Sequence, residues 1–355
     1  MFGFQNSIRS FFPIRKKELK KEKEVSFHFQ ESSFEMASDQ LRKRQFDSYA
    51  SAEQVMKGIN LFGKTFAVTG TTSGIGVETA RSLALSGAHV VMLNRNVSES
   101  EKLKNKIMEE NPNAQIDVVE CDLSSLQSTD KAAEDYISKG WPIHCLILNA
   151  GVCGAASPTT KDGLESHFGV NHLAHFHLLQ KLLPTVRRSA PARVVILSST
   201  ANQRTAINPK LSVDEKVRIL CPEDPSESNW YRFYARSKMC NTLTAFKLHR
   251  DENSNGISTY SVHPGALIRT SIFRDSWLVT LGSILVSPFT KSISQGAATT
   301  LYCATNPEIS EVSGKHWDSC WDDETTLDKV ISKDEAVQNA LWNHSENVLN
   351  KLLLK

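Results

Sequence analysis

The chain has 355 residues, of which 40% are hydrophobic, 8% aromatic and 23% charged, and its formal net charge is +2 at pH 7. This length and hydrophobic content allow an ample core in one large domain or two small ones. A net charge so close to zero gives no general reason to expect nucleic acid or an anionic membrane as a partner. The seven cysteines are scattered, odd in number and without a CxxC pair, which predicts free thiols in a reducing compartment.

Residues 1–60 differ in composition from the rest and are expected to form a disordered or peripheral tail. An apolar and aromatic start is followed by Arg15 to Glu24, which carries six cations against three carboxylates. The tail lacks the long apolar run of a secretory signal or a membrane span. A mitochondrial targeting helix and a membrane-surface anchor are the alternatives. Met36 offers a second start that would remove most of the tail, and the sequence does not say which start is used.

From residue 61 to 355 we expect one domain, because short β-branched runs alternate there with longer helical patterns. Such alternation is typical of an α/β fold with a parallel, doubly wound, Rossmann-like sheet. The predicted strands cover residues 65–70, 89–93, 114–120, 144–151, 193–199 and 257–265. No internal repeat or low-complexity linker divides this region, so it is read as a single domain.

The first predicted strand runs into a glycine-rich turn, TGTTSGIG, that opens a predicted helix. Gly70, Gly74 and Gly76 lie in this turn, together with Ser73 and Ile75. Without side chains, the backbone can approach a pyrophosphate, and the helix N-terminus can direct its free N–H groups at it. The alternative is a tight turn without a ligand. Because the glycines follow a strand and precede a helix, we predict a nucleotide-phosphate site.

A second motif lies in the predicted helix within NWYRFYARSKMCNTL, residues 229–243. Side chains four apart share a helix face, so Tyr234 stacks against Lys238, whereas Tyr231 stacks against Ala235. A nearby ammonium favours the phenolate, which would let Tyr234 exchange a proton near neutral pH. The alternative is an exposed pair on the surface of an amphipathic helix.

Five motifs, taken together, resemble the short-chain dehydrogenase/reductase family. They are TGxxxGIG, NAG at 149–151, SS at 198–199, YxxxK at 234–238 and HPG at 263–265. The likeness covers about residues 47–350 and is strongest to the WW domain-containing oxidoreductase and retinol dehydrogenase-like branches. No paired tryptophans of a WW module precede it, so the partner binding of that branch is not expected.

The resemblance implies roles for four residues. Tyr234 would be the general acid/base, and Lys238 would lower its pKa and hold the nicotinamide ribose. Ser199 would hydrogen-bond the reacting oxygen, with Ser198 the less favoured choice. Asn171 would complete the tetrad through a water to the lysine. One departure from the family pattern is Ala174, which stands where glycine is usual three positions after the asparagine.

The same stretch holds His172, His175 and His177, and imidazoles at helical spacing can bind metal. His172 and His177 should point apart, no carboxylate or cysteine completes a tetrahedral set, and the family uses no metal for this chemistry. We therefore predict no metal site. His263 is expected to be a strand-end residue bordering the nicotinamide rather than a catalytic base.

The cofactor prediction rests on the end of the second strand, where NAD binders place a carboxylate on the adenosine ribose. Here Asn94 takes that place, and Arg95 can cover a 2′-phosphate, so NADP(H) is favoured over NAD(H). The resemblance implies further cofactor contacts. They are Asp122, for which a helix N-cap is the alternative, Asn149, Gly151, Tyr234, Lys238, Pro264 and Gly265.

The expected reaction interconverts an alcohol and a carbonyl by hydride transfer. Residues 271–291 carry an apolar run of about fourteen residues, too short to span a bilayer, that resembles the substrate lid of the family near 266–292. An apolar lid favours a lipophilic substrate, such as a steroid, retinoid or aldehyde. The insert at 202–229 is expected to form a second flap over the site.

Two further expectations concern context. An NADP(H)-binding scaffold or regulatory protein with incidental turnover is the alternative function, since fold does not imply function. A soluble, mainly cytoplasmic enzyme is expected, with a peripheral membrane contact and a homo-oligomer left open, because three glutamates interrupt the cationic run of the tail.

Overall fold

A computed structural model describes residues 44–222, 229–265, 291–322 and 324–353. The chain divides into two units, Met1–Gln45 and Phe46–Lys355, and the fold below is that of the second. Nearly all of the first unit, and the predicted lid at 266–290, lie outside the described residues, as does the stretch 223–228 of the predicted flap.

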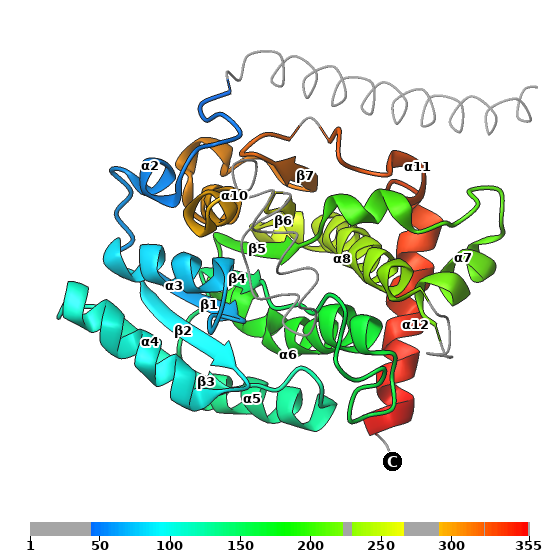
Figure 1. Ribbon diagram of the computed structural model, residues 1–355, viewed down its shortest axis with the longest axis horizontal. Helices are drawn as coiled ribbons and strands as arrows, with labels where there is room; N and C mark the ends of the chain where they lie inside the picture. The colour runs from blue at the N-terminus through cyan, green and yellow to red at the C-terminus, as the bar shows by residue number, and fades with distance from the viewer. Residues whose placement is uncertain (1–43, 223–228, 266–290, 323, 354–355) are drawn as a thin grey trace, which may run out of the picture. The chain divides into compact units, whose positions relative to one another are not determined.

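The centre of the domain is one sheet of seven parallel strands in the order β3-β2-β1-β4-β5-β6-β7 (Figure 1). The predicted α/β, doubly wound parallel sheet is confirmed. The strands are β1 (Thr65–Thr69), β2 (His89–Asn94), β3 (Gln115–Glu120), β4 (Cys145–Leu148), β5 (Ala192–Leu197), β6 (Ile257–His263) and β7 (Lys315–Asp318). The strand order reverses between β1 and β4, and ligands of such sheets bind at this switch point, beyond the carboxyl ends of the strands.

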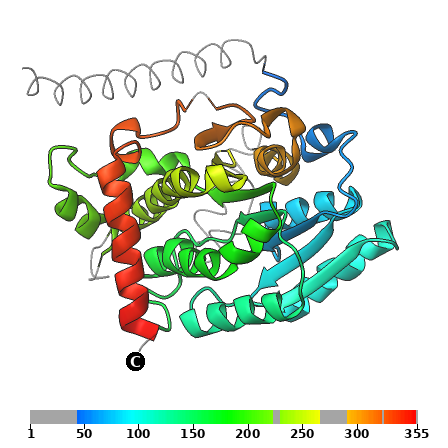
Figure 2. The same ribbon diagram turned by 180° about the vertical axis from the view of Figure 1, so that it is seen from behind.

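Two sets of helices cover opposite faces of the sheet, as Figures 1 and 2 show from the two sides. The first set comprises α2 (Ala52–Met56), α3 (Ile75–Leu85), α4 (Val97–Glu110) and α10 (Ile293–Thr305). The second comprises α5 (Leu126–Ser138), α6 (Ala174–Arg188), α7 (Val213–Leu220), α8 (Trp230–Glu252), α11 (Lys329–Ser332) and α12 (Glu335–Leu353). Three 3₁₀ turns and one π-helix complete the described elements: Thr200–Arg204, Asn253–Asn255, Pro307–Ile309 and Phe168–Leu173.

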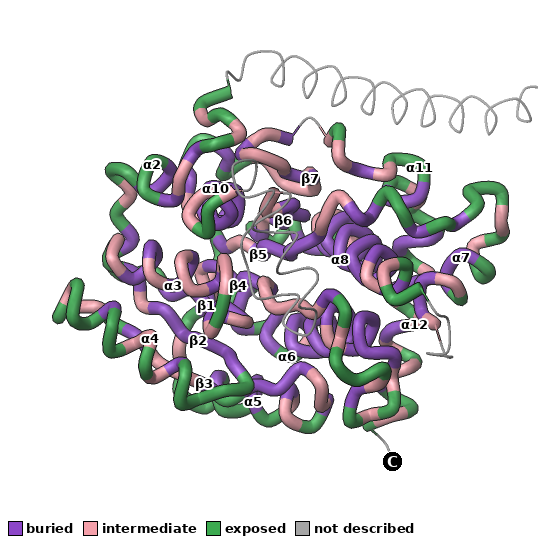
Figure 3. Tube along the Cα trace, viewed as in Figure 1, coloured by how far each residue is buried: buried purple, intermediate pink, exposed green. Residues whose placement is uncertain are grey.

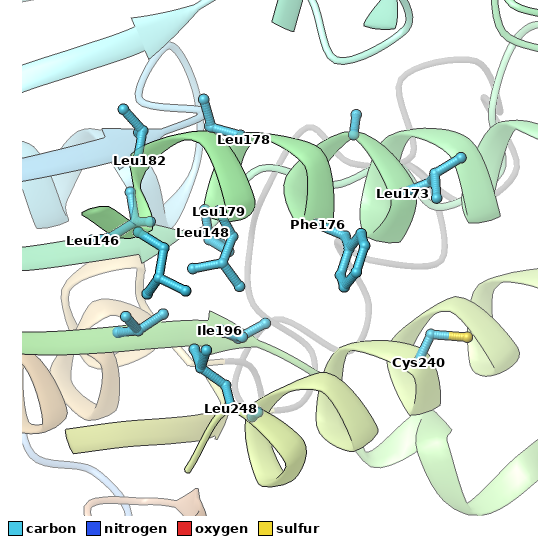
Figure 4. Packing of buried hydrophobic residues seen from close by; sticks show 14 of the residues in the cluster. Leu146, Leu148, Leu173, Phe176, Leu178, Leu179, Leu182, Ile196, Cys240 and Leu248 are labelled. Atoms are coloured by element: carbon cyan, nitrogen blue, oxygen red, sulfur yellow. The ribbon is translucent and has the colours of Figure 1, made fainter. Parts of the chain in front are cut away.

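The apolar core lies in two layers, one on each face of the sheet. The central strands are largely buried, as the tube coloured by burial shows (Figure 3). Successive side chains of a strand point to opposite faces of the sheet, so each strand contributes to both layers. Phe66 and Val68 pack in the layer under α3 and α10, whereas Ala67 packs in the other layer. On that second face, Leu179 of α6 lies beside Leu148 of β4 (Figure 4). Burial of β1, β2, β4, β5 and β6 on both faces explains why they read as nearly unbroken apolar runs.

The compact unit begins at Phe46, before the boundary expected at residue 61. Ser51 and Gln54 form a capping box that starts α2, and Ala52, Val55 and Met56 are buried against the rest of the domain. The strand β7 is also absent from the sequence-based prediction, because KHWD has only four residues and a charge at each end.

All seven cysteines are free and buried. Among the described residues, no helix is long and apolar enough to cross a membrane.

Candidate active site

The TGTTSGIG segment forms the turn between β1 and α3, at the carboxyl edge of the sheet. Gly70 and Gly74 have φ values of 73° and 59°, in the left-handed region that glycine adopts most readily. A Cβ at Gly70 would lie 2.7 Å from the Cα of Ala150, and a Cβ at Gly76 would overlap the Gly70 carbonyl oxygen. Gly74 caps α3 without a side-chain hydrogen bond. The first amides of α3 are therefore available to an anion that approaches the turn.

Asn149, just after β4, holds this turn in place. Its Nδ2 donates hydrogen bonds to the carbonyl oxygens of Thr69, at 2.8 Å, and Gly70, at 3.0 Å. The backbone N–H groups of Asn149 and Ala150 donate to Thr69 Oγ1, at 3.0 and 3.1 Å. The residues predicted to lie beneath the cofactor thus connect β4 to the end of β1.

Asn94 lies at the end of β2, as expected, but its side chain points into the protein and is only 2% exposed. Oδ1 accepts from the Thr71 backbone N–H at 2.7 Å, and Nδ2 donates to Thr71 Oγ1 and Ser100 Oγ, at 2.6 and 2.9 Å. Both amide donors are therefore used within the protein, and Asn94 supports the glycine turn. Arg95, the next residue, is exposed.

Asp122 follows β3 and is 8% exposed. Its carboxylate accepts hydrogen bonds from Ser124 and, at 2.8 Å, from Lys161 Nζ. Burial raises the pKa of Asp122, but the bonds from Lys161 and Ser124 outweigh it and hold that pKa below its usual value. The helix N-cap is Ser125, whose side chain accepts from the Ser128 N–H. The alternative interpretation of Asp122 as the N-cap is therefore wrong.

Tyr234 and Lys238 lie one turn apart on α8, and Lys238 Nζ is 5.8 Å from the centroid of the Tyr234 ring. Ser199, two residues after β5, is in hydrogen-bonding contact with the Tyr234 side chain. The structure thus brings these three predicted residues together. Tyr231 lies beside them, with its ring centroid 6.3 Å from that of Tyr234.

The electrostatics of this group differ from the expectation that the lysine lowers the tyrosine pKa. Burial raises the pKa of Tyr234 above its usual range, and the contact with Ser199 offsets this only in part. Burial also lowers the pKa of Lys238 to about 8. Lys238 Nζ donates to the Leu197 carbonyl oxygen at 3.1 Å, and that oxygen also accepts from Asn241 Nδ2 at 2.9 Å. Around neutral pH the tyrosine therefore carries its proton.

The two serines of the SS motif have separate roles. Ser198 is buried, and its Oγ donates to the Lys238 carbonyl oxygen at 2.9 Å and contacts Thr242 Oγ1 at 2.8 Å. Ser199 is partly exposed and accepts from the Ala201 N–H at 3.2 Å. Ser198 therefore fixes β5 against α8, while Ser199 faces the tyrosine.

Asn171 lies in a π-helix, Phe168–Leu173, directly before α6. Such wide turns carry one extra residue and are frequent at functional sites. The backbone N–H of Ala174 donates to the Gly169 carbonyl oxygen, as the wide turn requires, and Ala174 is fully buried. The extra methyl group at this off-pattern position is thus accommodated in the core.

The Asn171 side chain binds the segment that follows β4. Its Oδ1 accepts from the Val152 N–H at 2.7 Å, and its Nδ2 donates to the Val152 carbonyl oxygen and to Ser237 Oγ, each at 3.0 Å. A Cβ at Gly151 would lie 3.3 Å from both Asn171 Oδ1 and Lys238 Nζ. Gly151 is therefore the point at which the asparagine and the lysine meet.

Comparison with known proteins agrees with this geometry. The family model described as short chain dehydrogenase matches residues 64–209. The WW domain-containing oxidoreductase of Gallus gallus is 40% identical over 312 residues, which cover 88% of this chain and 74% of that protein. Retinol dehydrogenase 12 of Bos taurus is 36% identical over 291 residues, 82% of this chain and 88% of that protein. The chain belongs to the short-chain dehydrogenase/reductase family.

The predicted likeness to this family of oxidoreductases, and to the two branches named above, is confirmed. Among solved structures, L-sorbose reductase from Gluconobacter frateurii, complexed with NADPH and L-sorbose, matches with a TM-score of 0.56. The match covers 73% of this chain and 95% of that chain at 18% identity, so it supports the shared fold alone.

The three clustered histidines of this short-chain dehydrogenase/reductase point in different directions. Each ring contacts its own partners, which are Ser345 and Asn241 for His172, Thr69 and Asn171 for His175, and Asp130 for His177. Burial lowers the pKa of all three. Within residues that the structure describes, no group of three His, Cys, Asp or Glu side chains could hold a metal ion.

His263 is the last residue of β6, at the carboxyl edge, and its Nδ1 accepts from the Thr200 N–H at 3.3 Å. Burial lowers the pKa of His263 to about 4, so the ring is neutral near pH 7 and is a poor proton acceptor. Pro264 and Gly265 follow it at the same edge, and Gly265 has a φ of 112°.

Sequence reasoning missed two residues that support the site. The Thr69 hydroxyl oxygen accepts hydrogen bonds from the two backbone N–H groups that follow β4. Ser237 connects Asn171 to α8, because its hydroxyl accepts from the Asn171 side chain and donates to the Tyr234 carbonyl oxygen at 2.8 Å. A signal exists for both, since Thr69 opens the glycine motif and Ser237 directly precedes Lys238.

Proposed function

We propose that this family member is an NADP(H)-dependent oxidoreductase that interconverts an alcohol and a carbonyl on a lipophilic substrate. The observation that carries the proposal is the convergence of Ser199, Tyr234 and Lys238 at the carboxyl edge, beside the glycine turn. Fixed groups that meet at one point can bind and polarise a carbonyl and exchange a proton with it.

The residues of the turn suit a dinucleotide. A pyrophosphate could lie against Gly70 and Gly76, where a Cβ would collide with the backbone. The start of α3, which has no side-chain cap, would direct its free N–H groups at it. The residues that would hold the cofactor are Gly70, Ser73, Gly74, Ile75, Gly76, Arg95, Asp122, Asn149, Gly151, Lys238, Pro264 and Gly265. When bound, NADP(H) supplies or accepts the hydride.

Tyr234 would act as the acid in carbonyl reduction. Its raised pKa keeps the phenol protonated, and the proton passes from its hydroxyl to the carbonyl oxygen as that oxygen gains charge. Ser199 would donate a hydrogen bond to the same oxygen. Lys238, still mostly cationic at neutral pH, would stabilise the phenolate that remains.

NADP(H) is preferred over NAD(H) in this proposal because the end of β2 carries an amide and an exposed guanidinium. Asn94 brings no negative charge to repel a 2′-phosphate, and Arg95 offers it a fork of donors. The name of retinol dehydrogenase 12 supports a lipophilic alcohol as the substrate class.

The test is to incubate the purified chain with NADPH or NADH and a panel of lipophilic ketones and aldehydes. We expect oxidation of NADPH with at least one of them, and slower oxidation of NADH. Tight NADPH binding without turnover across the panel would instead support the scaffold alternative, and the absence of binding would contradict both.

We also propose that the enzyme is soluble and mainly cytoplasmic. Fractionation of the full chain at moderate salt should leave most of it soluble, as should a form that starts at Met36. The proposal would be wrong if the full chain were recovered in membranes or mitochondria while the shorter form stayed soluble. The tail would then be a targeting or anchoring segment.

A further inference from the structure

His175 lies in the first turn of α6, is 2% exposed and uses both ring nitrogens. Nε2 is 2.9 Å from Thr69 Oγ1, at the end of β1. Nδ1 is 3.0 Å from the carbonyl oxygen of Asn171, in the π-helix. One imidazole therefore joins the strand that leads into the glycine turn to the backbone of Asn171.

The direction of each hydrogen bond follows from what the partners can do. A carbonyl oxygen only accepts, so Nδ1 carries the proton and donates to Asn171. Burial lowers the pKa of His175 to about 4, so the ring is neutral and Nε2 accepts the Thr69 hydroxyl proton. Thr69 Oγ1 then has both acceptor sites filled by the N–H groups of Asn149 and Ala150. Every group in this connection is satisfied by one arrangement of protons.

The connection continues from Asn171 to the helix that carries the proposed acid. Asn171 Nδ2 donates to Ser237 Oγ at 3.0 Å, and Ser237 Oγ donates to the Tyr234 carbonyl oxygen at 2.8 Å. Hydrogen bonds therefore run without a break from the end of β1, through His175 and Asn171, to the first turns of α8.

We propose that His175 is a positioning residue that fixes Asn171, and through it Ser237 and the start of α8, relative to the cofactor edge of the sheet. The inference rests on the proposed function for its effect on turnover. Its structural content is independent of turnover: without the imidazole donor, the Asn171 carbonyl and the amide side chain that clamps Val152 lose their fixed orientation.

Two substitutions separate the two ring nitrogens. His175→Asn retains a donor near the Nδ1 position and keeps the bond to the Asn171 carbonyl. His175→Gln places its amide near the Nε2 position, where it contacts Thr69, and loses the donor to Asn171. We expect His175→Gln to lower kcat by about 10- to 100-fold, because small misplacements of catalytic groups have effects of that size. His175→Asn should lower kcat by a smaller factor, about 3- to 10-fold, since it keeps the bond to the Asn171 carbonyl but loses the contact with Thr69 at the end of β1.

His177 provides the matched control. It lies two residues further along α6, is 3% exposed and contacts Asp130 on α5, away from the site. His177→Gln should destabilise the protein to a comparable extent, yet leave kcat of the folded protein within about twofold. Equal kcat losses in His175→Gln and His177→Gln would overturn the inference.

Amide hydrogen exchange tests the same idea without turnover. The Val152 N–H is bound by Asn171 Oδ1, and the Gly154 N–H by His167 Nε2 at 3.1 Å. In the free enzyme, His175→Gln should speed exchange at Val152 by about tenfold, and leave Gly154 nearly unchanged. Unchanged exchange at Val152 would refute the positioning role. A wild-type chain without turnover in the carbonyl panel would refute only the proposed function.

Should the His175 variants fail to fold, Ser237→Ala removes the last connection without creating a large cavity. We expect it to lower kcat by about 3- to 10-fold with NADPH affinity unchanged, and to speed exchange at the Val152 amide. A Ser237→Ala enzyme with wild-type kcat and wild-type exchange would show that the hydrogen-bonded path does not position α8.

Discussion

The glycine turn after β1 and the start of α8 lie at the same edge of the sheet but depend on different physics. The turn depends on its backbone conformation, because some of its glycines have positive φ values and some approach other backbone atoms so closely that a Cβ would not fit. The properties of α8 at this edge depend on the burial of ionisable groups, which raises the pKa of Tyr234 and lowers that of Lys238. Steric changes should therefore damage the first region, and charge changes the second.

The largest effect should come from removing the hydroxyl group of Tyr234. Tyr234→Phe deletes the proposed proton donor, and we expect kcat to fall by about 100- to 10,000-fold while NADPH still binds. Steady-state kinetics and cofactor fluorescence measure the two effects separately. Tyr231→Phe is the matched control and should stay within a few-fold of wild type. Similar losses in the two variants would contradict the assignment.

The next effect tests the turn. Gly76→Ala puts a methyl group against the Gly70 carbonyl oxygen, so the turn must shift away from the phosphate position. We expect the Kd for NADPH to rise by about 10- to 100-fold, or about 1.4 to 2.8 kcal/mol. Gly140→Ala is a control outside the site, because nothing lies within 4 Å of the added Cβ, although its φ of 68° is itself unfavourable for alanine. An equal loss of NADPH affinity in both variants would argue against a steric role for Gly76.

Changing the charge at the end of β2 should have a smaller effect, on the preference for NADPH over NADH. Asn94→Asp combined with Arg95→Leu adds a carboxylate and removes the cation that would bind a 2′-phosphate. Thr71 and Ser100 can rotate their hydroxyl protons toward the new carboxylate, so the turn should survive. We expect the ratio of kcat/KM for NADPH over NADH to fall by about tenfold or more, or about 1.4 kcal/mol. An unchanged ratio would place cofactor selection elsewhere.

A final test concerns the stability of the fold rather than cofactor binding. Lys238→Met removes a buried cation, and the Leu197 carbonyl keeps its bond from Asn241. We expect the free energy of unfolding to rise by about 1–3 kcal/mol and Tm by a few degrees, with turnover lost. Scanning calorimetry measures this. A lower Tm at pH 7 would mean that Lys238 stabilises the fold.

The pH dependence of this difference has a definite sign. The folded-state pKa of Lys238, about 8, lies below its unfolded value of about 10.5, so the penalty for burying the cation is complete below pH 8. As pH rises from about 8 to about 10.5, the native lysine loses its proton first and the wild-type protein regains stability. The difference in the free energy of unfolding between Lys238→Met and wild type should therefore be largest below pH 8 and become smaller above it.

The sequence was sufficient to predict the parallel sheet, because strands buried on both faces leave apolar runs that alternate with helical patterns. It failed for β7, whose four residues resemble an exposed turn, and it placed the start of the domain after α2. Helical spacing correctly placed Tyr234 above Lys238. The spacing could not reveal that burial raises the tyrosine pKa, or that the Asn94 side chain points inward to Thr71, since both depend on residues distant in the chain.

The π-helix before α6 has a consequence for how this helix tolerates insertions and deletions. A wide turn absorbs one residue, and each residue of an α-helix rotates the next side chain by about 100°. The π-helix can thus direct Asn171 toward Gly151 while the leucines of α6 stay buried in the core, with Leu179 beside Leu148 (Figure 4). Loss of any single residue between Phe168 and Asn171 would close the turn to an α-helix and rotate the asparagine away from the lysine. In this segment the number of residues therefore matters as well as their identity, which is itself restricted at Gly169, where a Cβ would lie 2.5 Å from Thr160 Cγ2.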